Sequence, residues 1–177
     1  MIVCVFGASS ADLEDIYYNK AYELGETLSL KGHSIIFGGG DKGLMGSVAR
    51  GASDNDGYII SIAPRFFDKP GILFKECSEY IYTDTMNERK KLMEDKADAF
   101  IALPGGIGTY EELLEVMTLK QLGQLDKPIA IYNVNGYYAE FEKMMESTVK
   151  KGFMRNDANV YEMHSNLKEL ITYIERK

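Results

Sequence analysis

Short apolar runs alternate with longer amphipathic segments along the whole chain. The apolar runs are brief and rich in β-branched residues, which is typical of strands buried in a parallel sheet. They predict strands at residues 2–6, 34–37, 58–62, 80–82, 99–103, 129–133 and 159–163. The segments between them repeat their apolar positions at helical spacing or follow a capping residue. They predict helices at residues 13–31, 46–55, 87–96, 111–122, 137–151 and 167–176.

This alternation of strand and helix predicts an α/β fold of three layers, in which helices cover both faces of a mostly parallel sheet. The stretch 65–78 interrupts the pattern and is interpreted as a loop with room for a short helical turn. With 177 residues the chain is long enough for a sizeable core. It contains no repeat, linker or low-complexity segment, so we expect residues 1–177 to form one domain.

Turns of glycine or other small residues follow three of the predicted strands, at residues 7–10, 38–46 and 105–109. Ligands of parallel sheets bind beyond the carboxyl ends of the strands, so we expect these turns to share one site. Residues 38–46 contain the G-x-G-x-x-G spacing of dinucleotide-binding proteins, but after the second strand rather than the first. A P-loop is excluded because no Gly-Lys-Ser/Thr triplet occurs.

The sequence PGGIGTYEE, at residues 104–112, combines such a turn with the start of a helix. Glycines let the backbone approach a ligand closely. The free N–H groups and the dipole at a helix start favour an anion such as phosphate. Glu112 would lie about one turn inside this helix, close to the anion site. A carboxylate at that place indicates chemistry next to a bound phosphate.

Composition narrows the partners of this site. The formal net charge of −7 disfavours general binding to nucleic acid or to an anionic membrane. The two cysteines, Cys4 and Cys77, lack the spacing of a disulfide framework or a metal site, and they indicate incidental thiols in a reducing cytoplasm. The apolar N-terminus has no basic leader and predicts a first strand rather than a signal peptide. No apolar run is long enough to predict a membrane span.

Three segments of the chain resemble one known family. They are GGGDKGLMG at residues 38–46, MNERK at residues 86–90 and PGGIGTYEE at residues 104–112. They are similar to the glycine motif, the Met-x-x-Arg-Lys segment and the Pro-Gly-Gly-x-Gly-Thr-x-x-Glu signature of the LOG ("lonely guy") phosphoribohydrolases, which are often mislabelled as lysine decarboxylases. The resemblance covers nearly the whole chain. It implies a Rossmann-like fold, a homodimer, and an enzyme that needs no cofactor.

The resemblance also implies a reaction, the hydrolysis of the N-glycosidic bond of a nucleoside 5′-monophosphate such as AMP or a cytokinin ribotide. Arg89 and Glu112 match the family's catalytic arginine and glutamate. Cleaving a ribosyl–base bond passes through an oxocarbenium-like transition state, which a nearby carboxylate stabilises. The other expected substrate-binding residues are Ser9, Gly39, Gly40, Met86, Lys90, Gly105, Gly106, Gly108 and Thr109, the last four for the phosphate.

Plainer interpretations exist for several of these residues. Arg89 and Lys90 lie in a charged run that, by itself, is typical of a solvated helix face. Glu111 is typical of a first-turn acid that complements the helix dipole. The walls of the base pocket are expected from loop 65–78, from Met86 and from a second subunit. AMP and ribotides of N6-modified adenines are therefore both open as substrates.

One other function stays open at this point, and another is not expected. A non-catalytic nucleotide-binding or cofactor-carrier protein could use the same scaffold, although Arg89 and Glu112 together favour catalysis. Amino-acid decarboxylation needs pyridoxal phosphate and a Schiff-base lysine, and the sequence offers no lysine in a context that fits this role. A metal site is not implied, because Glu111 and Glu112 have no histidine companions at ligand spacing.

Overall fold

The computed structural model describes residues 1–154 and 160–176. The strands are β1 (Ile2–Phe6), β2 (Ser34–Phe37), β3 (Ile59–Pro64), β4 (Glu79–Thr83), β5 (Ala99–Ala102), β6 (Ile129–Tyr132) and β7 (Glu162–His164). The helices are α1 (Asp15–Leu30), α2 (Gly43–Ser53), α3 (Met86–Lys96), α4 (Ile107–Gln121), α5 (Ala139–Lys150) and α6 (Leu167–Ile174). Short 3₁₀ turns, η1 (Arg65–Phe67) and η2 (Val134–Gly136), lie in loops. Within the described residues, none of the helices is long and apolar enough to cross a membrane.

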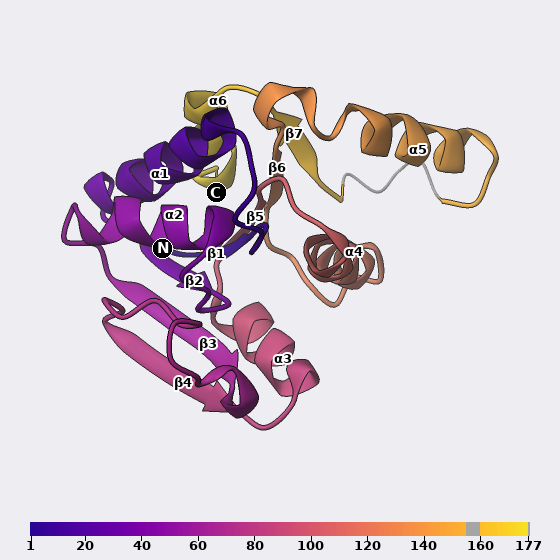
Figure 1. Ribbon diagram of the computed structural model, residues 1–177. Coiled ribbons are helices and arrows are strands. Elements are labelled where there is room, and N and C mark those ends of the chain that lie inside the picture. Colours follow the sequence, from indigo (N-terminus) through magenta and orange to yellow (C-terminus); the bar gives the residue numbers. More distant parts are fainter. Residues whose placement is uncertain (155–159, 177) are drawn as a thin grey trace.

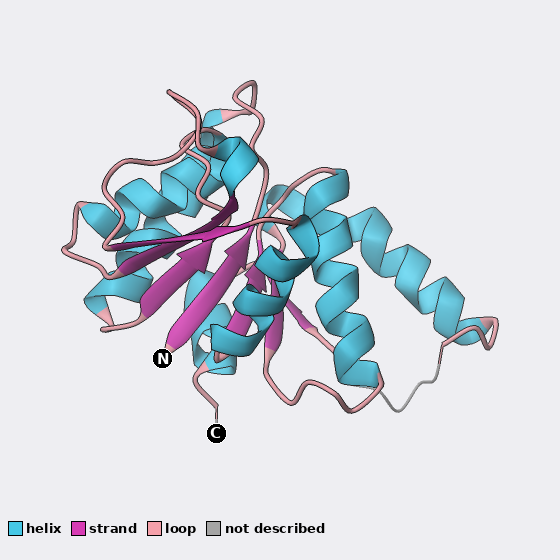
Figure 2. Cartoon of the chain, turned by 90° about the horizontal axis from the view of Figure 1, so that it is seen from below, coloured by secondary structure: helices cyan, strands magenta, loops and turns pink. Residues whose placement is uncertain are grey.

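The strands form one parallel sheet in the order β4-β3-β2-β1-β5-β6-β7. Figure 2 shows the sheet with helices on both of its faces. β1 pairs with both β2 and β5, so that Cys4 lies opposite Ile36 on one side and Phe100 on the other. The chain fills the sheet outward from β1 in one direction and then, from β5, in the other. Doubly wound sheets bind ligands at such a switch point. The predicted α/β fold with a parallel sheet is confirmed.

Successive side chains of β1 enter two separate cores, because neighbouring residues of a strand point to opposite faces of the sheet. Val3 and Val5 pack beneath α1, α2 and α6, whereas Cys4 and Phe6 pack beneath α3, α4 and α5. Figure 1 shows these two helical layers. Burial raises the pKa of the Cys4 thiol well above its ordinary value, so this cysteine acts as an inert apolar residue of the core.

The helices α1 and α2 cross at very short range, because each carries a glycine where the two backbones meet. A Cβ atom on Gly25 would overlap the carbonyl group of Val48, and one on Gly51 would overlap the carbonyl group of Tyr22. This close packing fixes α2 within its layer. It also fixes the glycine-rich turn that leads into α2 at the carboxyl edge of the sheet.

The helix α3 begins at a capping box formed by Thr85 and Glu88. The hydroxyl of Thr85 accepts a hydrogen bond from Glu88 N at 3.1 Å, and the Glu88 carboxylate accepts one from Thr85 N at 3.3 Å. These bonds satisfy N–H groups that a helix start otherwise leaves without acceptors. Because the box sets where α3 begins, it places Arg89 one turn into the helix.

Most predicted elements are confirmed to within a few residues, but the predicted start of α4 is wrong. The sequence predicts that helix from residue 111, whereas it begins at Ile107 with Gly106 as its N-cap. Much of the PGGIGTYEE motif is therefore helix rather than turn. Part of the strand predicted at 159–163 lies outside the described residues, and the strand in that region of the structure is β7.

Candidate active site

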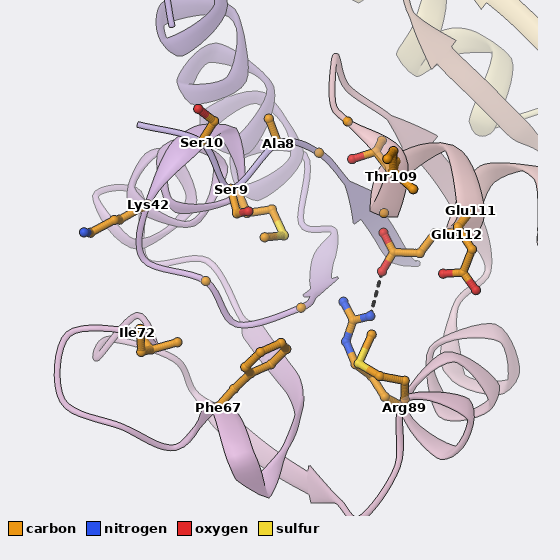
Figure 3. Close-up of a pocket in the computed structure, with 18 of the residues that line it drawn as sticks. Ala8, Ser9, Ser10, Lys42, Phe67, Ile72, Arg89, Thr109, Glu111 and Glu112 are labelled. Carbon is orange, nitrogen blue, oxygen red and sulfur yellow. Dashed lines mark hydrogen bonds and ion pairs between the residues drawn. The ribbon is translucent and has the colours of Figure 1, made fainter. Parts of the chain in front are cut away.

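A cavity of about 600 Å³ opens beyond the carboxyl ends of β1, β2 and β5 (Figure 3). Its rim includes parts of all three small-residue turns, at residues 7–10, 38–46 and 105–109. Residues of loop 65–78 form another wall, and α3 and α4 close the remaining side. The cavity thus lies where the sheet changes direction, between β1 and β5.

The turn after β1 is locked to its two neighbours by backbone hydrogen bonds. Ala8 N donates to Pro104 O at 3.0 Å, and Ala8 O accepts from Leu44 N at 2.8 Å. Residue 43 must be glycine for this contact, because its φ is +65° and a Cβ atom would overlap the Ala8 carbonyl oxygen. The three turns therefore form one connected rim around the cavity.

Arg89 of α3 and Glu112 of α4 form a buried ion pair that lines the cavity, marked by the dashed line in Figure 3. Nη1 of Arg89 donates to Oε1 of Glu112 at 2.7 Å, and Nε of Arg89 donates to Ile62 O at 3.2 Å. The two side chains are only 6% and 10% exposed. A charge-assisted hydrogen bond of this length is strong, and two well-packed helices set its direction.

Burial raises the pKa of the Glu112 carboxyl above its ordinary value, while the charge of Arg89 and its hydrogen bond oppose this rise. An arginine side chain stays protonated at any physiological pH. Arg89 therefore favours the carboxylate form of Glu112, yet Glu112 accepts a proton more readily than a surface glutamate does. Carboxylates whose ionisation is tuned in this way are typical of active sites.

The N-terminal end of α4 lines the cavity next to this pair. The backbone bond from Tyr110 N to Gly106 O, at 3.1 Å, is the first of the helix, so the N–H groups before it have no acceptor within α4. The N-cap residue Gly106 has no side chain that could accept from them. Together with the helix dipole and the Thr109 hydroxyl, these N–H groups suit a bound phosphate.

Another wall of the cavity is apolar. In Figure 3 the ring of Phe67 and the side chain of Ile72 border the cavity on the side that loop 65–78 forms. An aromatic ring and flexible thioethers can enclose a flat heterocyclic base without competing for its hydrogen bonds. The large apolar residues of this wall are Met45, Phe67, Ile72, Leu73 and Met86.

Most of the predicted site residues line this cavity. They are Ser9, Gly40, Met86, Arg89, Gly106, Gly108, Thr109 and Glu112. Gly39 does not line it: its φ is +83° and a Cβ atom would overlap the Ser61 hydroxyl, so packing explains this glycine. Gly105 does not line it either, and its carbonyl accepts a hydrogen bond of 2.6 Å from the Tyr137 hydroxyl. Lys90 does not line it, and its ammonium group pairs with Glu111, which lines the cavity, and with Glu115, which does not.

The cavity also has lining residues that the sequence did not single out. Met45 belongs to the GGGDKGLMG motif but was not chosen from it, and the motif itself was the signal that could have found it, whereas Gly38 lines the cavity as the clustering of residues 38–40 at the sheet edge predicts. Phe67 was covered only as part of loop 65–78. No periodic pattern marks an aromatic residue in an irregular loop, so the sequence alone gives it no role.

The protein has a Rossmann-like fold, because its sheet is doubly wound. At the switch point of this sheet lie a helix N-terminus without a capping side chain and the buried Arg89–Glu112 pair, an arrangement that suits a nucleotide.

The family model described as "Possible lysine decarboxylase" matches residues 45–174. The chain is 37% identical over 174 residues to the cytokinin riboside 5′-monophosphate phosphoribohydrolase LOG5 of Arabidopsis thaliana, which covers 98% of this chain and 76% of that protein. The protein LOG2 of the same plant, with the same activity in its name, is 38% identical over 156 residues, 88% of this chain and 73% of the relative. The chain belongs to the LOG family.

Solved structures share the fold at lower identity. The molybdenum cofactor carrier protein of Chlamydomonas reinhardtii superposes with a TM-score of 0.73 at 22% identity, over 97% of this chain and 93% of that chain. The molybdenum cofactor binding protein of Rippkaea orientalis gives a TM-score of 0.71 at 22% identity, with the same coverage. At such identities the likeness supports the fold and carries no information about the ligand.

Proposed function

We propose that the protein hydrolyses the N-glycosidic bond of purine nucleoside 5′-monophosphates, with adenine or an N6-modified adenine as the base, and releases the free base and ribose 5-phosphate. The observation that carries this proposal is the Arg89–Glu112 pair beside the open N-terminus of α4. The relatives named as phosphoribohydrolases support the same reaction.

The N-terminus of α4 would hold the 5′-phosphate of the substrate. The main-chain N–H groups of residues 107–109 and the Thr109 hydroxyl supply donors, and the helix dipole favours the negative charge. The phosphate takes no part in the bond that breaks, so binding it serves to orient the sugar. Anchoring the substrate in this way removes much of the entropic cost of reaching the transition state.

Glu112 would act on the ribose. As the C1′–N9 bond lengthens, its electron pair moves onto the base and positive charge develops on C1′ and the ring oxygen. The Glu112 carboxylate stabilises this charge and accepts a proton from the water whose oxygen bonds to C1′. The base takes up a proton from solvent and leaves, and Glu112 later returns its proton to solvent. Arg89 keeps Glu112 ionised and correctly aimed until water attacks.

The apolar wall of the cavity would receive the base. Phe67 and Met86 offer faces on which a purine can stack, and Ile72 and Leu73 extend the apolar surface beyond it. A cavity of about 600 Å³ is spacious for a small nucleotide, since ligand pockets of this kind span about 300–1,000 Å³. Both AMP and an AMP with an apolar N6 group are therefore proposed as substrates.

The test is a side-by-side rate measurement on AMP and isopentenyl-AMP, with chromatographic detection of free base and ribose 5-phosphate. We expect release from at least one nucleotide, and a rate about 10²- to 10⁴-fold lower in Glu112→Gln. Glu146→Gln is the control, since Glu146 is an exposed residue of α5 far along the chain from the cavity lining. Tight nucleotide binding without release of base at high protein concentration would instead indicate a carrier.

Decarboxylation, which the description of the family model suggests, is not proposed. A lysine that forms a Schiff base is normally desolvated or placed beside another cation, so that its amine is neutral. Lys42, which lines the cavity, is exposed to solvent. We therefore expect no release of carbon dioxide from lysine, with or without added pyridoxal phosphate.

We further propose that the protein is a cytoplasmic homodimer built from one domain per chain. Exposed apolar side chains on the helical layer of α4 and α5 support a second copy as partner, among them Leu114 at 39% and Met144 at 51% exposure. Sedimentation analysis tests the oligomeric state directly. A dimer that dissociates in Leu114→Glu supports an interface on α4, and a monomeric wild-type protein contradicts it.

A further inference from the structure

Lys90 follows Arg89 in α3 but, unlike Arg89, it does not line the cavity, and its side chain reaches two acids of α4. Its Nζ lies 2.8 Å from Oε2 of Glu115 and also donates to the carboxylate of Glu111. Hydrogen bonds to these two acids raise the pKa of Lys90, which keeps it charged. The side chain is only 12% exposed, which is low for a lysine. These contacts hold the ammonium group on the acids of α4, where Glu111 lies between Lys90 and the cavity that it lines.

The two acids that Lys90 holds lie on one face of α4. Glu111 and Glu115 are four residues apart, so they are neighbours on the helix surface and one ammonium group can bridge them. Glu112 follows Glu111 and points about 100° further around the helix, towards Arg89. Two consecutive cations of α3 thus hold two faces of α4. This arrangement resists rotation of α4 about its axis and so fixes the direction of the Glu112 carboxylate.

The same lysine offsets a group of negative charges around Glu112. A second, much smaller void of about 10 Å³ is lined by Glu94, Glu112 and Glu115 together with Lys90. Glu94 is only 8% exposed. Without the ammonium group, the charges of the partly exposed Glu111 and Glu115 would be uncompensated beside the buried Glu112, whose pKa the Glu111 carboxylate already raises.

We propose that Lys90 is a positioning residue for the hydrolysis, which holds the acids of α4 so that Glu112 stays aimed at the ribose. Lys90 itself does not touch the substrate. The inference rests on the proposed function, because it gives Lys90 no chemistry of its own. It also differs from the expectation raised by the MNERK motif, in which Lys90 binds the substrate.

The test compares Lys90→Met with Lys91→Met in steady-state hydrolysis of AMP and isopentenyl-AMP. Lys91 is the matched control, since it also lies on α3 but pairs with Asp95 of the same helix and is 68% exposed. We expect Lys90→Met to lower kcat about 10- to 100-fold while KM changes less than about threefold. Lys91→Met should change neither constant. Lys90→Arg should keep most of the rate, because a guanidinium can bridge the same two acids.

A second substitution separates positioning from a purely structural role. Adding Glu115→Gln to Lys90→Met removes one of the acids that the missing lysine leaves uncompensated near Glu112. We expect this double variant to regain about threefold in kcat over Lys90→Met alone. A lysine that merely stabilised the fold would show no such recovery at saturating substrate.

An unchanged kcat in folded Lys90→Met overturns the inference. A large rise in KM at constant kcat overturns it as well, because that result indicates a direct substrate contact. If circular dichroism shows that Lys90→Met does not fold, the single variant Glu115→Gln provides the test. A lowered kcat at constant KM then supports the inference, and an unchanged kcat overturns it.

Failure of this inference can be distinguished from failure of the proposed function. A wild-type protein that hydrolyses neither nucleotide overturns the proposed function, and this inference with it. An active wild type with an unaffected Lys90→Met overturns the inference alone.

Discussion

The guanidinium of Arg89 occupies space that only a glycine at position 38 leaves open. A Cβ atom on Gly38 would overlap Nη2 of Arg89 and lie 3.2 Å from its Cζ. The φ of Gly38 is not in the left-handed region, so this glycine is required for room and not for backbone conformation. The glycine motif after β2 and the buried pair on α3 and α4 are therefore parts of one structural unit.

We predict that Gly38→Ala displaces Arg89 and breaks its hydrogen bond to Glu112. The expected result is a fall in kcat of about 100-fold, because a small misplacement of a catalytic group has a large effect on rate. The new methyl group should also lower the free energy of unfolding by about 1–3 kcal/mol, as overpacking does. Steady-state kinetics and thermal unfolding measure both effects. Full activity in Gly38→Ala would contradict the assigned role of the pair.

The clash between residues 38 and 89 can be isolated by a double-mutant cycle. Lysine at position 89 has no planar guanidinium to meet the added methyl group. The loss of stability caused by Gly38→Ala should therefore be smaller in an Arg89→Lys background. Equal losses in both backgrounds would mean that the methyl group meets something other than the guanidinium.

Gly108 should show the opposite relation between stability and activity. A Cβ atom at this position meets nothing within 4 Å, and residue 108 lies in the first turn of α4. Gly108→Ala should therefore raise the free energy of unfolding by about 0.5–1 kcal/mol, since alanine has the higher helix propensity. It should also raise KM for the nucleotide about tenfold, because the methyl group stands where the phosphate is proposed to bind.

The nucleoside without its phosphate provides the control for Gly108→Ala. If the methyl group interferes with the phosphate, the rate of adenosine hydrolysis should be low and should be the same in wild type and variant. Equal losses on adenosine and AMP would instead place the disturbance at the sugar or the base. Chemical denaturation provides the independent reading of stability.

The order of elements could be predicted from the sequence, because each apolar run in this fold is a strand buried on both faces. The residue at which α4 begins could not be predicted from the sequence. Glycines at positions 105, 106 and 108 predict a turn by their low helix propensity. Tertiary packing overrides this low helix propensity. The ring centroid of Tyr110 lies 5.8 Å from the ring centroids of both Tyr138 and Phe141, and this packing anchors the first helical turn.

The sequence could predict that Arg89, Glu112 and the start of α4 line one cavity, but it could not predict where Lys90 lies. Arg89 and Lys90 are adjacent in the sequence, and one motif contains both. On a helix, however, neighbouring residues point about 100° apart, so only Arg89 faces the cavity. Which of two adjacent cations does so depends on the rotation of α3. That rotation is set by packing and by the Thr85 cap, which motif spacing does not report.

The activity should depend on pH through Glu112. Its pKa is raised by burial, only partly opposed by Arg89, and the proposed mechanism needs the ionised form. The rate should therefore fall with acidification at a pH above the ordinary carboxyl value of 4.5. A pH profile of kcat measures this limb, and Glu112→Gln should abolish it together with most of the activity.

The charge of Glu111 predicts the direction in which the acid limb of this pH profile should move when Glu111 is replaced. The carboxylate of Glu111 raises the pKa of Glu112, so Glu111→Gln should move the acid limb to lower pH. A limb that stays in place, or moves to higher pH, would assign the titration to another group.

Glu94 should reduce the stability of the protein at neutral pH. It lies on α3 and is 8% exposed, and burial raises the pKa of its carboxyl, with the charge of Glu115 adding to the rise. A folded-state pKa above the unfolded value means that the native state binds the proton more tightly. Ionisation of Glu94 therefore disfavours the folded state at any pH above the raised pKa.

We predict that Glu94→Gln raises the melting temperature at pH 7, and that the gain shrinks on acidification and vanishes below the unfolded-state pKa of about 4.3. Wild-type Glu94 is protonated there in both states, so it resembles glutamine. Thermal unfolding from pH 4 to pH 8 measures the gain, with Glu146→Gln on the exposed face of α5 as the control. A lower melting temperature in Glu94→Gln at pH 7 would mean that the Glu94 carboxylate is stabilised by its attraction to Lys91 and Lys90 more than burial destabilises it.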